Sequence, residues 1–304
     1  MARAFLGIDV QEQGLTFAAL AKGKLANRLL GLRFESLPGA AELSSRQPNI
    51  RDSRRFVEAL RRGATLLAGR EERVALSLPD RVGRLLMIEV DAPFKSRQEG
   101  IDILKWRLKS SLPLPPAQTH IDYQILARRE DGRQRCLVAA IGLPLLDQYQ
   151  DLVNEAGRHA LHIDFHTLNL YNYYRPRLDL GDEFALVRLE KGQLSLQYFQ
   201  ARSLVYQRSR SIQPHSEQIF REINRTLVDV YDKYASARRC AVFAHVDTEL
   251  TEIADELLHV VFEREIHLLD AGLQRLATGA IAGGLEATGA VVAALGGAER
   301  LIRI

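Results

Sequence analysis

Hydrophobic and polar positions along this chain predict the same succession of elements twice. Short alternating segments that end at charged or glycine-containing turns indicate strands, and apolar residues spaced three or four apart indicate helices. The first block predicts three strands, a helix and a strand, at residues 4–10, 15–20, 26–37, 52–67 and 73–78.

The second block repeats this order roughly 180 residues later, a spacing too long for a solenoid repeat. It predicts strands at 183–189, 194–200 and 203–212, a long helix at 216–234, a strand at 240–246, a helix at 250–261 and a strand at 265–269. The apolar stripe of the long helix comprises Phe220, Ile223, Leu227, Val230 and Tyr234. Meandering strands followed by alternating helices and strands predict a mixed sheet with helices on its faces, so we expect an α/β protein of two lobes.

The first block contains an insertion that the second block lacks. After Pro79 the pattern predicts a strand, a helix, two strands and a helix, at residues 84–91, 96–111, 120–128, 135–141 and 145–156. A strand at 161–165 then re-enters the first lobe. We therefore expect a first lobe over residues 1–172, with a small inserted subdomain at about 84–157, and a second lobe over residues 173–304.

The composition is that of an ordinary globular protein, with 46% hydrophobic and 26% charged residues. The formal net charge is +3 without any block of like charges, so nothing in the sequence favours nucleic-acid binding. Cys136 and Cys240 lie in separate apolar segments, which indicates buried thiols in a reducing compartment. The N-terminus runs directly into a strand pattern, which predicts that no signal peptide is present.

The stretch 277–297 has the length of a membrane span but not its composition. It carries one charge, Glu286, and consists mainly of alanine and glycine. A charge near the bilayer centre costs about 2.5 kcal/mol or more. We therefore expect a small-residue helix that packs closely against a neighbour. Four of its glycines (Gly279, Gly283, Gly284 and Gly289) do not form a phosphate-binding P-loop motif, because no Lys-Ser or Lys-Thr follows them.

An ordered series of short motifs resembles the PilM family of type IV pilus assembly proteins. The series comprises 74–79 (VALSLP), 87–90 (MIEV), 105–106 (KW), 112–115 (LPLP), 121–126 (IDYQIL), 138–140 (VAA), 154–157 (NEAG) and 222–227 (EINRTL). The order and spacing of these motifs carry the resemblance, which covers nearly the whole chain. The chain is also similar to MshI of mannose-sensitive haemagglutinin (MSHA) pilus systems, to the cytoplasmic part of GspL of type II secretion, and to FtsA.

The resemblance implies an actin-like (ribonuclease H-like) two-lobed fold with a small subdomain inserted in the first lobe. It also implies a cytoplasmic protein at the inner-membrane face, peripheral to the membrane, that binds the cytoplasmic tail of a PilN-like membrane protein and other pilus or secretion platform proteins. On this interpretation the chain is a scaffold of an MSHA-like assembly platform. The alternative is an active ATPase of the PilM or FtsA type that couples nucleotide state to partner binding. A sugar or acetate kinase of the broader superfamily fits least well, because no phosphate cradle or catalytic carboxylate is recognisable.

Actin-like ATPases hold phosphates with one hairpin turn in each lobe, and small residues there let backbone N–H groups approach the phosphate. In the first turn Asp9 is in place to hold a hydrated Mg²⁺ ion. Val10 or Gln11, however, occupies the usual glycine position, and Glu12 brings a negative charge.

The second loop is also altered. Asp179-Leu180-Gly181 matches its first half, but two acids follow where the resemblance implies threonine, and the sequence at 245–248 replaces the adenosine-side glycines. These departures favour a degenerate nucleotide site and no cofactor, with Mg-ATP as the alternative. The residues of that vestigial site are Asp9, Gln11, Asp179 and Gly181.

The resemblance places partner binding on the insert. The expected contact residues are Leu86, Ile88, Trp106, Leu112, Pro113 and Tyr123. The seam between the insert and the first lobe joins two folding units, where grooves commonly form. An extended apolar tail fits such a groove through main-chain hydrogen bonds and one or two apolar pockets. Without the resemblance, a single tryptophan is more often a core residue than a binding residue.

One group of histidines invites a metal interpretation. His162, Asp164 and His166 would share one face of a strand, with His159 nearby, and imidazole with carboxylate suits zinc. The spacing supplies no fourth ligand, and the alternate positions of this segment are apolar. We therefore expect a polar strand face and no metal.

Overall fold

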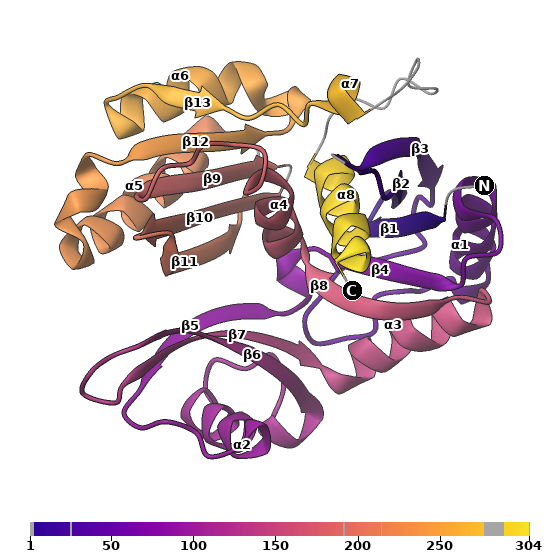
Figure 1. Ribbon diagram of the computed structural model, residues 1–304, viewed down its shortest axis with the longest axis horizontal. Helices are drawn as coiled ribbons and strands as arrows, with labels where there is room; N and C mark the ends of the chain where they lie inside the picture. The colour runs from indigo at the N-terminus through magenta and orange to yellow at the C-terminus, as the bar shows by residue number, and fades with distance from the viewer. Residues whose placement is uncertain (1–2, 25, 191, 214, 277–288, 304) are drawn as a thin grey trace. The chain divides into compact units, whose positions relative to one another are not determined.

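The computed structural model describes residues 3–24, 26–190, 192–213, 215–276 and 289–303 (Figure 1). Its contacts divide the chain into two compact units. The first unit comprises Met1–Val82, Leu143–Leu178 and Asp270–Ile304, and the second comprises Gly83–Gly142 and Asp179–Leu269. Each unit is therefore assembled from segments that lie far apart in the sequence.

The first unit contains a five-stranded sheet in the order β3-β2-β1-β4-β8. Its strands are β1 (Ala4–Gln11), β2 (Gly14–Ala21), β3 (Arg28–Ser36), β4 (Arg73–Leu78) and β8 (His159–Phe165). The first three strands form an antiparallel meander, and β4 and β8 continue the sheet in parallel. The helices of this unit are α1 (Ser53–Ala68), α3 (Leu143–Glu155), α4 (His166–Tyr174), α7 (Leu273–Leu276) and α8 (Gly289–Ile302).

Helix α8 lies close against β1 because glycines, which have no side chain, stand at the points of contact. A Cβ atom added to Gly7 of β1 would lie 1.8 Å from the carbonyl oxygen of Ala294, and one added to Gly296 would lie 2.1 Å from that of Asn169 in α4. The expected close packing of a small-residue helix is thus confirmed for residues 289–297. Residues 277–288, with Glu286 and the first three glycines of the discarded P-loop interpretation, lie outside the described residues.

The second unit contains a five-stranded sheet with the same topology, in the order β11-β10-β9-β12-β13. Its elements are β9 (Phe184–Glu190), β10 (Gln193–Gln200), β11 (Ser203–Ser211), α5 (Ser216–Lys233), β12 (Ala241–Val246), α6 (Thr251–Phe262) and β13 (Ile266–Leu268). Strand β10 alternates between Leu194 and Leu196, which enter the core, and Gln193 and Ser195, which face the other way.

The insert forms its own three-stranded antiparallel sheet in the order β5-β7-β6. Its elements are β5 (Arg84–Val90), α2 (Arg97–Arg107), β6 (Thr119–Arg128) and β7 (Gln134–Gly142). The insert core contains the buried thiol Cys136, and the core of the second five-stranded sheet contains the buried thiol Cys240. Both cysteines are free and buried, as expected.

The compact units differ from the predicted lobes in three ways. Helix α3, expected within the insert, packs against α1 and β8 of the first unit. Helix α8, expected in the second lobe, lies on the first sheet, because Gly7 and the small residues of α8 fit one another there. The insert sheet groups with the second five-stranded sheet, since β5 and β6 contact β11.

Two local predictions need correction. The stripe of α5 was predicted to include Phe220, but that side chain is 43% exposed and Ile219, at 0%, enters the core instead. Helix α4 was not predicted, because its sequence is rich in tyrosine and asparagine and lacks a simple apolar stripe. Among the described residues, no helix combines the length and hydrophobicity that a bilayer crossing requires.

Candidate functional site

The first hairpin, formed by β1 and β2, carries Asp9 and Gln11 of the expected nucleotide site. Asp9 is fully buried near the end of β1, with its Oδ1 3.9 Å from Nδ1 of His166. Gln11 pairs with Gly14 to close the two-residue turn. Glu12 was expected to place a negative charge beside a phosphate. Its Oε1 atom forms an ion pair with Nη2 of Arg81 at 3.0 Å.

The structure places the other two predicted nucleotide-site residues away from the equivalent turn. Asp179 and Gly181 precede β9, where the Gly181 N–H donates to Asp179 Oδ1 at 3.3 Å. By sheet topology, the counterpart of the first turn is the β9–β10 turn, which the pair Glu190 and Gln193 closes. Asp9 and Gln11 therefore correspond in register to Arg188 and Glu190, and neither Asp179 nor Gly181 lies on this hairpin.

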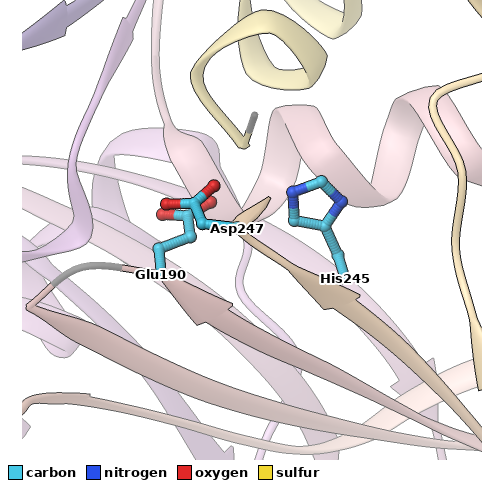
Figure 2. A group of neighbouring side chains, drawn as sticks. All are labelled: Glu190, His245 and Asp247. Carbon is cyan, nitrogen blue, oxygen red and sulfur yellow. The ribbon is translucent and has the colours of Figure 1, made fainter. Parts of the chain in front are cut away.

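A cluster that sequence reasoning missed lies where β9 and β12 end (Figure 2). Glu190, His245 and Asp247 each offer a ligand atom, and these three atoms lie within 4.8 Å of one another. Glu190 and His245 are buried, and Asp247 is half-buried. The sequence did offer one signal. Charged or ionisable residues are spaced by two in each segment, at 188 and 190 and at 245 and 247, and this spacing places them on one face of a strand.

A groove of about 430 Å³ lies within the second unit. It runs along β5 on one side and along β11 and α5 on the other. Its walls are formed by Leu85, Leu86, Met87, Ile88, Glu89, Arg135, Val205, Tyr206, Gln207, Arg208, Arg210, Asp229, Lys233 and Tyr234. This groove therefore joins the insert to the second five-stranded sheet, whereas the sequence led us to expect a groove between the insert and the first lobe.

Two of the predicted partner residues, Leu86 and Ile88, line this groove. Leu112 and Tyr123 are partly buried against the core of the insert, and Pro113 is buried. Trp106 is 70% exposed on α2, with the Lys109 ammonium 5.9 Å from its ring centroid. The structure thus brings part of the predicted set to one groove and leaves Trp106 on a separate surface of the insert.

Ion pairs organise the charged residues of the groove. Arg135 pairs with Glu89 at 3.1 Å, Lys233 pairs with Asp229 at 2.7 Å, and the Tyr206 hydroxyl donates to Asp229 at 2.8 Å. The bond from Lys233 is the main cause that lowers the pKa of Asp229, so this carboxylate stays ionised at neutral pH.

The histidine group does not form the strand face that would suit zinc. His166 begins α4 instead of continuing β8, and its Nε2 lies 2.7 Å from the carbonyl oxygen of Gly289. Asp164 forms an ion pair with Arg300. Burial, followed by the nearby Arg300 charge, lowers the pKa of His162. His159 and Asp164 thus have protein partners, Asn154 and Arg300 respectively.

No protein-family model matches the chain, and no curated protein matches its sequence. Solved structures do match. A chain of the PilM–PilN type IV pilus biogenesis complex superposes with a TM-score of 0.73 at 17% identity, covering 97% of each chain. A Bacteroides thetaiotaomicron protein with an actin-like ATPase fold gives 0.53 at 12% identity, covering 88% of this chain and 91% of that chain.

The cytoplasmic domain of EpsL, an inner-membrane component of the type II secretion system of Vibrio cholerae, gives a TM-score of 0.52 at 10% identity. That match covers 98% of this chain and 95% of that chain. The chain therefore has the actin-like fold, and the expected structural resemblance to PilM and to a type II secretion component is confirmed.

Proposed function

We propose that this chain is a cytoplasmic scaffold of a type IV pilus-type assembly platform, such as that of MSHA pili, at the inner-membrane face. In this role it holds the extended cytoplasmic tail of a PilN-like membrane protein in the groove between β5 and β11. The observation that carries the proposal is that this groove is bordered by the edge strands of two sheets in a chain with the fold of a PilM–PilN complex component.

An edge strand presents backbone N–H and C=O groups that a further strand can use. Among the described strands, β5 ends the insert sheet and β11 ends the second five-stranded sheet. An extended peptide in the groove can add to either edge through main-chain hydrogen bonds, which is a common mode of tail recognition. The fold thus supplies affinity for an extended segment before any side chain contributes.

The side chains of the groove indicate what kind of tail fits. Leu85 and Met87 are half-buried along β5, so apolar residues of the tail would cover them. The lining contains four basic groups (Arg135, Arg208, Arg210 and Lys233) and two acidic groups (Glu89 and Asp229). An apolar tail that also carries an acidic residue would therefore complement the groove in charge.

The proposed scaffold works without nucleotide. Gln11 closes the first turn with a side chain where the nucleotide-site pattern calls for a small residue, and Arg188 stands in register where a second acidic residue would correspond to Asp9. Both features support a degenerate site and a role in binding proteins instead of hydrolysing ATP.

The test is a calorimetric titration of the full chain with the tail peptide of the PilN-like protein from the same cell. Met87→Asp places a charge at the half-buried wall of the groove and should weaken binding at least roughly tenfold, equal to about 1.4 kcal/mol. Leu66→Asp is the matched control, because Leu66 is 62% exposed on α1 of the first unit. Equal affinity of Met87→Asp and Leu66→Asp would show that the groove is not the binding site.

Trp106→Ala separates the two surfaces of the insert. If the tail also reaches α2, as the sequence predicts, this variant weakens binding while Asp9→Ala does not. Weakening by Met87→Asp alone would confine the tail to the groove. Weakening by Trp106→Ala alone would move the site to the exposed face of α2.

A further inference from the structure

We propose that Glu190, His245 and Asp247 bind one divalent transition-metal ion, Zn²⁺ or Mn²⁺, at the carboxyl ends of β9 and β12. The proposal does not depend on the partner groove, because no residue of the cluster lines that groove. His245 and Asp247 belong to the segment that replaces the adenosine-side glycines, and the sequence analysis assigned them no ligand.

Strand register explains why these three side chains meet. Strands β9 and β12 are parallel, with His245 opposite Arg188, so both strands end at the same edge of the sheet. The backbone N–H of Asp247 donates to the carbonyl oxygen of Leu189 at 3.0 Å and ties the two ends together. Side chains two residues apart share a face, so His245 and Asp247 join Glu190 opposite the apolar core.

The donor geometry suits a small ion. Zinc bonds of about 2.0–2.2 Å place tetrahedral ligand atoms roughly 3.4 Å apart. The three ligand atoms already lie within 4.8 Å of one another, so small side-chain rotations would complete the contacts. Figure 2 shows the two carboxylates beside each other, with the imidazole of His245 near them on β12, which ends just before Asp247. The half-buried position of Asp247 leaves a path for the ion to enter.

The charges around the cluster favour a cation. Two adjacent carboxylates repel each other unless positive charge lies near them. The Arg188 Nη1 atom donates to Oε2 of Glu190 at 3.1 Å, which offsets one charge and fixes the orientation of that carboxylate. A carboxylate has two oxygens, so Glu190 can bind an ion through Oε1 while Arg188 acts as an outer partner.

A fourth group of the same face strengthens the assignment. Gln193 lies directly opposite Glu190 across the β9–β10 pair and is only 8% exposed. Within the part of the chain that the structure describes, its buried Oε1 atom has no hydrogen-bond partner. Amide oxygens bind divalent ions, and side chains directly opposite on neighbouring strands have Cβ atoms about 5 Å apart.

The identity of the ion follows from the mixed donor set. Imidazole suits zinc and other transition metals, whereas sites for Mg²⁺ and Ca²⁺ consist of oxygen ligands. One imidazole with two carboxylates is therefore expected to select Zn²⁺ or Mn²⁺ over Mg²⁺ and Ca²⁺.

The test uses the full chain after treatment with a chelator and removal of the chelator. Calorimetric titrations with Zn²⁺, Mn²⁺, Mg²⁺ and Ca²⁺ should give one site per chain, with the transition ions bound at least roughly tenfold more tightly. His245→Gln and Asp247→Asn should each weaken binding by roughly tenfold or more. The control variants are His120→Gln and Asp151→Asn, which change exposed residues outside the cluster.

Each result decides the question. The visible absorption spectrum of the Co²⁺-loaded protein should change in Asp247→Asn and remain unchanged in the controls. Because Asp247 is half-buried and follows the end of β12, Asp247→Asn keeps the test valid if His245→Gln does not fold. Failure of every ion to bind wild-type protein at millimolar concentration, or equal affinities in cluster and control variants, would overturn the proposal.

Discussion

The two five-stranded sheets have the same strand order and the same two-residue hairpin, yet their faces differ in chemistry. In the first sheet β2 is buried along its whole length. Helix α8 contacts this sheet at Gly7, and helix α1 contacts it at Phe17. In the second sheet α5 and α6 share the apolar core, while the other face bears buried polar groups. These groups are Arg188, Glu190, Gln193, Ser195, Gln197 and His245.

The same strand topology therefore supports close packing of small residues in one sheet and a buried polar face in the other. The first sheet achieves close packing through small residues, with α8 in close contact with β1 at Gly7. The second sheet buries a larger set of polar and charged side chains on one face, at a cost that partners must offset. Packing defects should therefore do most harm in the first sheet, although that sheet also buries the carboxylates of Asp9 and Glu35.

The largest effect is expected for Gly7→Ala in the first sheet. The new Cβ would lie 1.8 Å from backbone atoms of α8, so either the strand or the helix must move. We expect a loss of about 3 kcal/mol or more in the free energy of unfolding, measured with urea. Gly31→Ala in β3 is the control, because its Cβ meets only the side-chain tip of Leu67 and should cost under about 1 kcal/mol.

A smaller effect is expected in the second unit, where the register of α5 can be tested. Ile219 is fully buried, so Ile219→Ala should lower the free energy of unfolding by about 2–4 kcal/mol. Phe220→Ala should cost under about 1 kcal/mol, because that ring is 43% exposed. Equal losses for the two neighbours would contradict the observed helix register.

The pH dependence of the first unit should reveal a buried carboxylate on β3. Burial by itself raises the pKa of Glu35, but hydrogen bonds from Arg62, at 2.8 Å, and from Arg33 lower it below the ordinary value of 4.5. A lowered pKa in the folded state stabilises the fold above pH 4.5, and this contribution is lost as the pH falls through the folded-state pKa.

Glu35→Gln should therefore cost about 1–2 kcal/mol at pH 7 and flatten the acid limb of stability between pH 5 and pH 3. Denaturant titrations across that pH range measure both effects. Glu58→Gln on α1 serves as the control, because its partner Arg54 is exposed and the pair contributes little. An unchanged acid limb in Glu35→Gln would show that other groups control the pH dependence.

The smallest effect is expected for nucleotide. Mg-ATP that bound at ~100 times its dissociation constant would add about 2.7 kcal/mol of stability. With Gln11 in the first turn and Arg188 in the second hairpin, we expect no measurable shift in melting temperature. A clear stabilisation that Asp9→Ala abolishes would instead favour the active ATPase.

Sequence patterns predicted most elements because their cause is local. Alternation along β10 and the three-to-four spacing along α1 reflect which side of one element is buried, and neighbouring residues reveal that directly. The α5 register was shifted by one residue, because Ile219 and Phe220 are both apolar and only packing separates them. Helix α4 was missed because its buried residues include Asn169 and two tyrosines, and the Tyr173 hydroxyl donates to the carbonyl oxygen of Ala271, 98 residues away.

The candidate sites could be predicted only in part. Asp9 and Gln11 lie on the hairpin that the sequence predicts, since a hairpin and its residues are contiguous in sequence. Asp179 and Gly181 were chosen by a motif, whereas strand register shows that the β9–β10 turn is the true counterpart of the first hairpin. The cluster of Glu190, His245 and Asp247 depends on two strands being adjacent, which a single sequence does not state.

By itself, the sequence determined the repeated strand order, the insert and the need for a close-packed helix of small residues near the C-terminus. Only the tertiary structure decided that this helix lies on the first sheet, because the fit of Gly7 to α8 is a contact between residues nearly 300 positions apart. It also decided that β5 and β11 border one groove. Both arrangements depend on shape complementarity between distant surfaces, which hydrophobic periodicity does not encode.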